Sequence, residues 1–277
     1  MLNLIFLLLS VFATVGTYAF GAVSSLWWIP LLLIGGYLAA VIVYLLFLWV
    51  CTWFLPTKKP ISKPKPFCRF MIRVTMEWVM TLLHIKVEIR GLEKMPDEPC
   101  VVVCNHRSDF DPMTLLAVLK NRKIAYISKA SNFKIPLVGP FIFHAGFLAI
   151  DRENAVRAVR TLKTAAHRMQ ETGVDIGIYP EGTRSRTNKL LRFKSGAFVL
   201  AKDADAPIAV MSTKGTELIS KRAIFRRVRV KMEILEVIGK QDVRTMSAEE
   251  LSARSKELIE ISLYGAKQTK AGEAAES

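Results

Sequence analysis

The first 57 residues of this chain carry no charged side chain, since the first Lys, Arg, Asp or Glu is Lys58. About 20 apolar residues span the roughly 30 Å hydrocarbon core of a bilayer. This stretch therefore has room for two apolar helices, over residues 2–20 and 27–55, and Gly35 and Gly36 would allow the second to bend. A cleaved signal peptide is the alternative for the first segment, but no Lys or Arg precedes its apolar run. The sequence thus predicts a membrane-embedded helical hairpin, formed by two passes or by a re-entrant or interfacial pair.

Positive charge follows the second apolar segment directly, at Lys58, Lys59, Lys63, Lys65, Arg69 and Arg73. Because Lys- and Arg-rich flanks stay cytoplasmic, we expect the bulk of the chain on the cytoplasmic side of the membrane. Prolines at 56, 60, 64 and 66 predict a stiff linker, and helical spacing of apolar residues over 69–83 predicts an amphipathic helix at the headgroups. The expected organisation is an anchor over residues 1–57, a linker and interfacial helix over 58–83, one α/β domain over 84–267 and a flexible tail over 268–277.

The chain has 39 basic and 24 acidic residues, and its formal net charge is +15. A nucleic-acid partner is one interpretation of that balance, but the sequence lacks zinc-ligand spacing and aromatic–basic interleaving. Beside a membrane anchor, anionic membrane lipids and phosphorylated substrates account for the charge better. The basic residues between 221 and 231 indicate a membrane-facing or a merely solvated surface. The four cysteines lack paired metal spacing, and we interpret them as reduced structural thiols: Cys51, Cys68, Cys100 and Cys104.

Short apolar or alternating runs predict strands over residues 85–89, 101–104, 124–127, 147–150, 174–179, 207–211 and 228–234. Stretches that suit helices lie between and after them, over 112–120, 154–171, 195–202 and 247–264. Strands that alternate with helices are typical of the α/β class. We therefore predict an α/β fold with a mostly parallel or mixed sheet flanked by helices, preceded by the N-terminal membrane-embedded helical hairpin.

A histidine and a carboxylate, His106 and Asp111, follow the apolar run 101–104. In a helix their five-residue separation would leave them about 140° apart, so they meet only if the chain between them turns. Asp is a favoured N-cap and Pro a favoured first helical residue, so Asp111-Pro112 predicts that a helix begins there. A carboxylate bonded to one ring nitrogen would leave the other nitrogen of His106 as a general base. The alternatives are that Asp111 only caps the helix, and that Asp109 competes as the carboxylate.

A second polar turn follows the apolar run 174–179 and contains Glu181, Gly182, Thr183 and Arg184. Ligands of α/β folds bind beyond the carboxyl ends of strands, and the guanidinium fork of arginine suits a phosphate. Asp151-Arg152 repeats the arrangement after residues 147–150. We predict that Arg152 and Arg184, at neighbouring strand ends, converge on one anion; a surface ion pair in either turn is the alternative.

Other catalytic patterns are missing from the sequence. It has no Gly-rich Walker loop, no Gly-x-Ser-x-Gly elbow and no paired His/Glu metal motif. His84, His144 and His167 have no carboxylate at a matching spacing, and we interpret them as structural or exposed. A kinase, a serine esterase and a zinc enzyme are therefore poorly supported, and we predict no metal site.

Four blocks together resemble the glycerolipid acyltransferase family, and within it the 1-acylglycerol-3-phosphate acyltransferase branch. They are residues 105–111, with His-x-x-x-x-Asp in an Asn-His-x-Ser setting, residues 146–152, residues 179–185, with Tyr179 in place of Phe in Phe-Pro-Glu-Gly-Thr-Arg-Ser, and residues 193–198. The resemblance covers about residues 101–211. One departure is Ala-Pro-Ile-Ala-Val at 206–210, where the family has a second proline at the position of Val210. That departure leaves the acceptor and the acyl-chain preference open.

The resemblance implies acyl transfer from acyl-CoA or acyl-carrier protein to the sn-2 hydroxyl of 1-acylglycerol 3-phosphate (lysophosphatidate), which gives phosphatidic acid. It implies that His106 is the general base, that Asp111 supports it, and that Arg152 and Arg184 clamp the acceptor phosphate in a pocket shaped by Glu181, Gly182 and Thr183. It implies no metal and no bound cofactor. The alternatives are acylation of glycerol 3-phosphate or of another lysophospholipid, and a non-catalytic lipid-binding protein with this fold. Retention of both His106 and Asp111 argues against the last.

Overall fold

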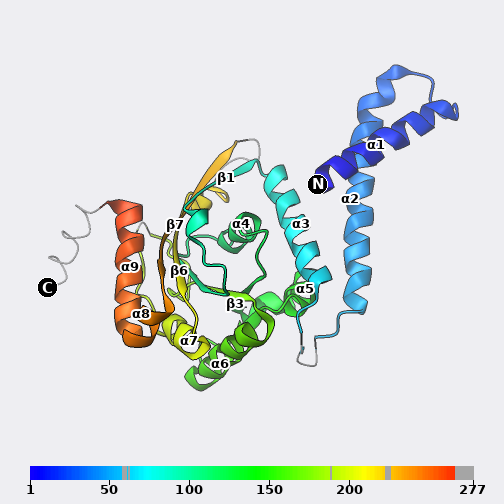
Figure 1. The fold of residues 1–277 in the computed structure, drawn as a ribbon. Helices are drawn as coiled ribbons and strands as arrows, with labels where there is room; N and C mark the ends of the chain where they lie inside the picture. The colour runs from blue at the N-terminus through cyan, green and yellow to red at the C-terminus, as the bar shows by residue number, and fades with distance from the viewer. Residues whose placement is uncertain (58–60, 62, 188, 222–225, 266–277) are drawn as a thin grey trace.

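The computed structural model describes residues 1–57, 61, 63–187, 189–221 and 226–265. A sheet forms its centre (Figure 1). It has seven strands in the order β1-β7-β6-β2-β5-β3-β4. The strands are β1 (Ile85–Arg90), β2 (Val101–Cys104), β3 (Ile124–Lys129), β4 (Leu148–Ile150), β5 (Asp175–Ile178), β6 (Ile208–Lys214) and β7 (Val228–Ile238). Each predicted strand is present; β2 has the predicted bounds, and the ends of the others are shifted by up to four residues.

Parallel pairing dominates this sheet. β2 lies between β5 and β6 and is parallel to both, with Val101 opposite Ile176 and Ile208, and β3 and β4 continue the parallel order. β7 is antiparallel to β6 and parallel to β1. The predicted mixed sheet is therefore confirmed. Because β2 to β6 all run in one direction, the loops that follow them emerge at the same edge of the sheet, and this edge is where α/β folds place their ligand sites.

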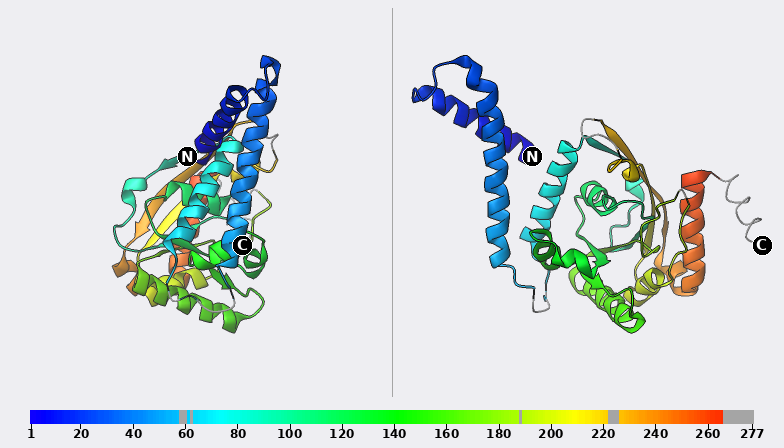
Figure 2. Two further views of the ribbon diagram at one scale, coloured as in Figure 1. Left: turned by 90° about the vertical axis from the view of Figure 1, so that its right-hand side faces the viewer. Right: turned by 180° about the vertical axis from the view of Figure 1, so that it is seen from behind.

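Helices cover both sides of the sheet (Figures 1 and 2). One side carries α6 (Ala155–Thr172), α7 (Gly196–Ala204), α8 (Lys240–Thr245) and α9 (Ala248–Tyr264), and the other carries α3 (Pro66–Leu82), α4 (Asp111–Val118) and α5 (Val138–His144). Short 3-10 segments occur at η1 (Leu26–Trp28), η2 (Leu92–Lys94), η3 (Ala130–Lys134) and η4 (Thr216–Leu218). All four residues of β2 are buried, which explains why this strand is an uninterrupted apolar run.

Helix α5 was not predicted from the sequence. Its seven residues include Gly139 and Pro140, and both residue types are poor helix formers. Gly139 is needed for a close approach, because a Cβ there would lie 2.1 Å from the carbonyl oxygen of Phe133. Packing against α3 therefore stabilises this helix. The local sequence pattern does not predict it.

The N-terminal segment folds into two apolar helices, α1 (Leu2–Ala19) and α2 (Ile29–Trp53), which pack together as a hairpin. Both are long and apolar enough to cross a membrane, by length and composition. The Ser10 hydroxyl donates to the Leu33 carbonyl at 2.5 Å, and a Cβ on Gly36 would lie 3.0 Å from Ser10 Cα. α2 is one helix through Gly35 and Gly36, so Gly36 serves close packing of the two helices, as small residues do between membrane helices.

Helix α3 joins the hairpin to the sheet domain, and it begins at Pro66, three residues before the predicted start. The Tyr44 hydroxyl lies 2.6 Å from Thr75 Oγ1, and the Trp78 indole donates to the Tyr37 hydroxyl at 3.2 Å. The rings of Phe6 and Trp78 pack edge to face with 5.5 Å between their centroids. The base of the hairpin is thus fixed to the domain, whereas its turn projects away (Figure 1). The predicted tail, residues 268–277, lies outside the described residues.

Candidate active site

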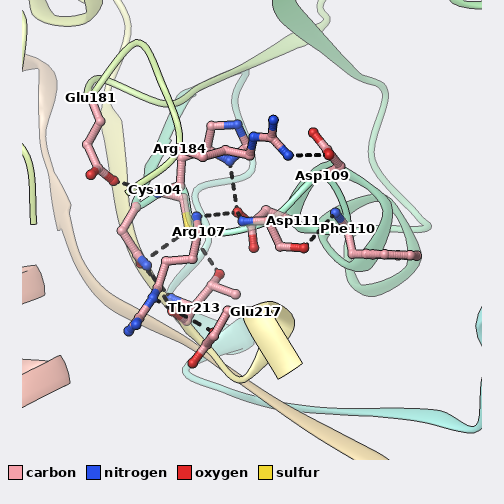
Figure 3. Close-up of polar contacts among 12 residues, drawn as sticks. Cys104, Arg107, Asp109, Phe110, Asp111, Glu181, Arg184, Thr213 and Glu217 are labelled. Carbon is pink, nitrogen blue, oxygen red and sulfur yellow. Dashed lines mark hydrogen bonds and ion pairs between the residues drawn. The ribbon is translucent and has the colours of Figure 1, made fainter. Parts of the chain in front are cut away.

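The loop after β2 brings His106 and Asp111 together. Asp111 Oδ2 lies 2.8 Å from His106 Nδ1 and also accepts hydrogen bonds from the backbone N–H groups of Arg107 at 2.7 Å and Ser108 at 2.8 Å (Figure 3). The Asp111 side chain is fully buried, so the loop closes around its carboxylate. An ionised carboxylate only accepts hydrogen bonds, which places the proton on His106 Nδ1 and leaves Nε2 as an acceptor. The turn that the five-residue separation requires is therefore present.

Helix α4 begins at Asp111, where the sequence predicts a helix start, but its N-cap differs from the expected one. Its N-cap is Phe110, Asp111 is the first helical residue, and the cap makes no side-chain hydrogen bond. The expectation that Asp111 is the N-cap is wrong, because its carboxylate turns back to the loop instead of toward the helix N–H groups. The competing carboxylate, Asp109, points to Arg184 and is exposed (Figure 3). Asp111 is therefore the carboxylate that contacts His106.

Two tyrosines stack behind the histidine. The ring of Tyr179 lies on the imidazole of His106 with 4.3 Å between centroids and 22° between planes. Tyr126 lies parallel to Tyr179, with centroids 6.0 Å apart. Gly177 makes room for this stack, since a Cβ there would lie 2.4 Å from Tyr126 Cε1. Burial raises the pKa of both tyrosines, so they are neutral rings that fix one face of the imidazole.

Glu181 ties the loop of His106 to the turn after β5. It is buried, Oε1 accepts from the His106 backbone N–H at 2.6 Å, and Oε2 accepts from the Leu191 N–H at 3.0 Å. The Ser185 N–H donates to the His106 carbonyl at 2.8 Å. Burial raises the pKa of Glu181, and its two N–H donors oppose that rise. Both carboxylate oxygens are engaged by backbone groups, so Glu181 holds the two loops in register.

The turn after β5 places positively charged side chains beside the loop that carries His106. Gly182 has φ +69°, a conformation that favours glycine, and a Cβ on it would lie 3.1 Å from Lys194 Nζ. Arg184 pairs with Asp109, and both side chains are exposed, as is Thr183. Arg152 follows β4, but β3 lies between β4 and β5. The expectation that Arg152 and Arg184 stand at neighbouring strand ends is therefore wrong. At about 4.8 Å per strand, their strands are roughly 10 Å apart.

Three residues that shape the site had no role in the sequence prediction. Asn105 is fully buried; its side chain donates to the Thr213 carbonyl at 2.9 Å and accepts from the Thr213 N–H at 2.7 Å, which fixes the end of β2 to β6. Arg107 Nε lies 3.8 Å from Glu217 Oε2 (Figure 3). Asn105 and Arg107 belong to the motif, so the sequence could have drawn attention to them. Glu217 is 110 positions from Arg107, and only the fold brings it there.

The one thiol close to the histidine is unsuited to nucleophilic attack. Cys104 is buried, its Sγ lies 3.0 Å from Thr213 Oγ1, and burial raises its pKa. Thiolates are the reactive form of cysteine, so Cys104 is inert. His144 is also structural, because its Nε2 lies 3.1 Å from the Pro56 carbonyl. The arrangement as a whole can take a proton at His106 Nε2 beside a group of cations.

This chain is similar to known acyltransferases. Residues 86–214 match a family model described as "Acyltransferase". The human 1-acyl-sn-glycerol-3-phosphate acyltransferase beta is 33% identical over 56% of this chain and 56% of its own length. The chloroplastic LPAT1 enzyme of that name from Arabidopsis thaliana is 34% identical over 62% of this chain and 50% of its own. The chain thus spans about half the length of these curated relatives.

A solved structure is similar over a larger part of its length. The crystal structure of the 1-acyl-sn-glycerophosphate (LPA) acyltransferase PlsC from Thermotoga maritima superposes with a TM-score of 0.59 at 27% sequence identity. The match covers 72% of this chain and 79% of that chain. The matched share of this chain is larger than the 86–214 segment.

Proposed function

We propose that this chain is a glycerolipid acyltransferase that transfers a fatty acyl group from a thioester to the sn-2 hydroxyl of 1-acylglycerol 3-phosphate, giving phosphatidic acid. The observation that carries the proposal is the 2.8 Å contact of His106 with Asp111, next to the turn that carries Arg184. A base beside an arginine is what acylation of a phosphate-bearing alcohol requires. The test is an acceptor screen: full-length protein, radiolabelled thioester and separated lipid products. Product from glycerol 3-phosphate alone would contradict the assigned acceptor.

The proposed chemistry needs one proton carrier. His106 Nε2 takes the proton of the sn-2 hydroxyl as its oxygen attacks the thioester carbonyl carbon. The carbon–sulfur bond then breaks, and the imidazolium returns the proton to the departing thiolate. Asp111 stabilises the imidazolium through Nδ1. No protein nucleophile and no bound cofactor is needed, and acyl-CoA and acyl-carrier protein both supply the required thioester.

The acceptor phosphate is proposed to bind at Arg184, with Arg152 reaching the same anion from the end of β4. In support, the partner of Arg184 in the structure is a carboxylate, Asp109, on an exposed side chain. Exposed ion pairs contribute only about 0–1 kcal/mol, so a phosphate with more charge and more acceptor oxygens can displace it. Gly182 and Thr183 shape this pocket, and Glu181 supports it from behind.

Replacing Arg184 by lysine is expected to weaken acceptor binding by roughly 1.5–3 kcal/mol, the range for hydrogen bonds to charged groups. That is about 10- to 150-fold at 1.4 kcal/mol per decade. Lysine keeps the charge but loses the two-pronged fork, and the side chain is exposed, so the fold should be unaffected. Steady-state kinetics with lysophosphatidate varied at saturating thioester, and the reverse, separate the two substrates. A higher KM for the thioester with an unchanged acceptor KM would assign Arg184 to the donor.

We further propose that residues 1–57 anchor the protein in the membrane, that residues 58–83 lie at its surface, and that the catalytic domain, residues 84–267, faces the cytoplasm. Two apolar helices and the basic residues after them support this placement. A lysophospholipid resides in the bilayer, so anchoring brings the base to its substrate. Anionic membrane lipids are the expected partners of the basic surface.

The anchor makes a prediction about extraction. The full chain in membranes is expected to resist high salt and alkaline carbonate and to need detergent, because α1 and α2 bury apolar surface in lipid. A fragment beginning at Lys58 is expected to bind membranes reversibly, since charge attraction to lipid is screened by salt. Sedimentation of membranes after each wash, with immunodetection of the protein, measures both. Release of the full chain by salt alone would show that the hairpin is not embedded.

A further inference from the structure

A groove of about 270 Å³ lies between α3, α4 and the segment that leads into β4. It is far from the candidate active site, because Ile124 at its rim pairs with Asp175 at the amino ends of β3 and β5. His106 and Arg184 follow the carboxyl ends of their strands, at the opposite edge of the sheet. The groove is therefore a separate feature of the fold.

The groove combines cations with apolar walls. Its cationic residues are Arg69, Arg73, Lys120, Arg122 and Lys123, and no Asp or Glu is among the described residues that line it. Phe70, Leu119 and Phe147 are among its apolar residues. Arg122 is already neutralised, since its Nε and Nη2 donate to the two oxygens of Asp175 at 2.6 and 2.7 Å. Arg73 Nε lies 4.0 Å from Glu77 Oε1, so Arg69, Lys120 and Lys123 supply the excess of positive charge beside the apolar surface.

Arg69 is a half-buried cation of the groove. Its Nε donates to the Ala145 carbonyl at 3.0 Å, but its Nη2 is buried without a hydrogen-bond partner among the described residues. Burial and the nearby charge of Arg168 lower the pKa of Arg69. A buried guanidinium that keeps an unused donor is costly unless an acceptor reaches it. An anion in the groove would supply that acceptor.

The groove lies at the level where α2 ends. The Pro56 carbonyl, just after α2, contacts His144. The carbonyl of Ala145, the residue after His144, accepts a hydrogen bond from Arg69. Trp49 and Trp53 pack edge to face in the last turns of α2, with centroids 4.8 Å apart, and both are exposed. Tryptophan gathers where the hydrocarbon of a membrane meets water. The cations of the groove therefore stand at the depth of the lipid headgroups.

We propose that this groove is a binding site for the headgroup of an anionic phospholipid of the surrounding membrane, distinct from the acceptor site. The lipid phosphate contacts Arg69 and Arg73 at the bottom of the groove, and Lys120 and Lys123 lie at its rim. The parts of the acyl chains nearest the glycerol pack on Phe70. Lipid is favoured over a soluble anion because one wall is apolar and α2 ends beside it. The site does not depend on acyl transfer.

Calorimetric titration of the full chain in neutral detergent tests this site. The probes are dioctanoyl-phosphatidylglycerol, dioctanoyl-phosphatidylcholine and inorganic phosphate. Lys120→Gln/Lys123→Gln is expected to bind phosphatidylglycerol about 30-fold more weakly, which is about 2 kcal/mol at 1.4 kcal/mol per decade, the contribution of two cations beside an anionic lipid. The matched control, Arg160→Gln/Lys163→Gln on exposed positions of α6, should bind as the unchanged protein does. Arg69→Gln should also bind weakly.

The remaining measurements distinguish a lipid site in the groove from binding at the acceptor site or binding of a soluble anion. Arg184→Lys should keep the full affinity for phosphatidylglycerol, and loss of binding in that variant would place the lipid at the acceptor site. Equal affinity for phosphatidylcholine, or an equal loss in the α6 control, would overturn the proposal. Displacement of the lipid by inorganic phosphate at the same concentration would make the groove a site for soluble anions. Binding in the groove by a protein without acyltransferase activity would refute the proposed function alone.

Discussion

His106→Ala is expected to lower the turnover number by about 10²–10⁴-fold, the contribution of general-base assistance. The loop should survive the change, because its two backbone bonds, from the His106 N–H to Glu181 and from the Ser185 N–H to the His106 carbonyl, do not use the imidazole. The loss should therefore appear in kcat, with the acceptor KM little altered. Steady-state kinetics with lysophosphatidate and a saturating thioester measure it.

Two controls make the result for His106→Ala specific. The variant should fractionate with membranes as the unchanged protein does, and its thermal unfolding should be similar. His144→Ala removes a histidine that contacts the Pro56 carbonyl, so it should affect stability more than turnover. If His106→Ala kept a tenth or more of the normal turnover, a different group would be the base.

Asp111→Asn is expected to lower turnover by about 100-fold. The amide oxygen can still accept from the N–H groups of Arg107 and Ser108, but the negative charge that supports the imidazolium is lost. Hydrogen bonds that involve a charged group contribute up to about 3 kcal/mol, which is about 100-fold in rate. The amide nitrogen would take the place of Asp111 Oδ1, which is buried without a hydrogen-bond partner among the described residues. Because the buried amide N–H groups would have no acceptor there, we also expect the free energy of unfolding to fall by about 1–3 kcal/mol.

Asp109→Asn is the matched control for Asp111→Asn, with the same chemical change two positions away. Its side chain is exposed and paired with Arg184. Freeing that arginine should lower the acceptor KM by up to about 5-fold, since exposed ion pairs are worth about 0.2–1 kcal/mol, and kcat should change little. Kinetics and thermal unfolding of the two variants side by side decide the assignment. A larger loss of turnover in Asp109→Asn would make Asp109 the supporting carboxylate.

The parts of this protein that sequence predicts are those set by local pattern. Uninterrupted apolar runs mark the hairpin and β2, and alternation marks β7, because burial on one or both faces imposes those periods. The contact of His106 with Asp111 also follows from a short turn within one loop. Local pattern does not determine how strands order themselves, which is why β3 was not expected between the strands that precede Arg152 and Arg184.

The residues that hold the His106 loop in place could not be predicted from the sequence for a related reason. Glu181 is 75 positions from His106, and the pairing exists only once β2 and β5 lie side by side. The same holds for Tyr179 on the imidazole. The sequence left two roles open for the Asp111 carboxylate, contact with His106 or capping of the helix, because Asp before Pro at the start of a helix has a strong local explanation as a cap. Tertiary contacts with the loop override that preference.

The double engagement of Glu181 has a consequence for selectivity. The Glu181 carboxylate accepts hydrogen bonds from the backbone of His106 and from the segment that follows the turn carrying Arg184. If the acceptor phosphate binds Arg184 as proposed, its binding would therefore also fix the position of the imidazole. Binding of the phosphate would then raise the turnover number as well as the affinity for the acceptor. A monoacylglycerol offers the same kind of hydroxyl without the phosphate, and saturating amounts of it should still react slowly. The proposed acyltransferase would in this way discriminate against neutral lipids that offer the same hydroxyl.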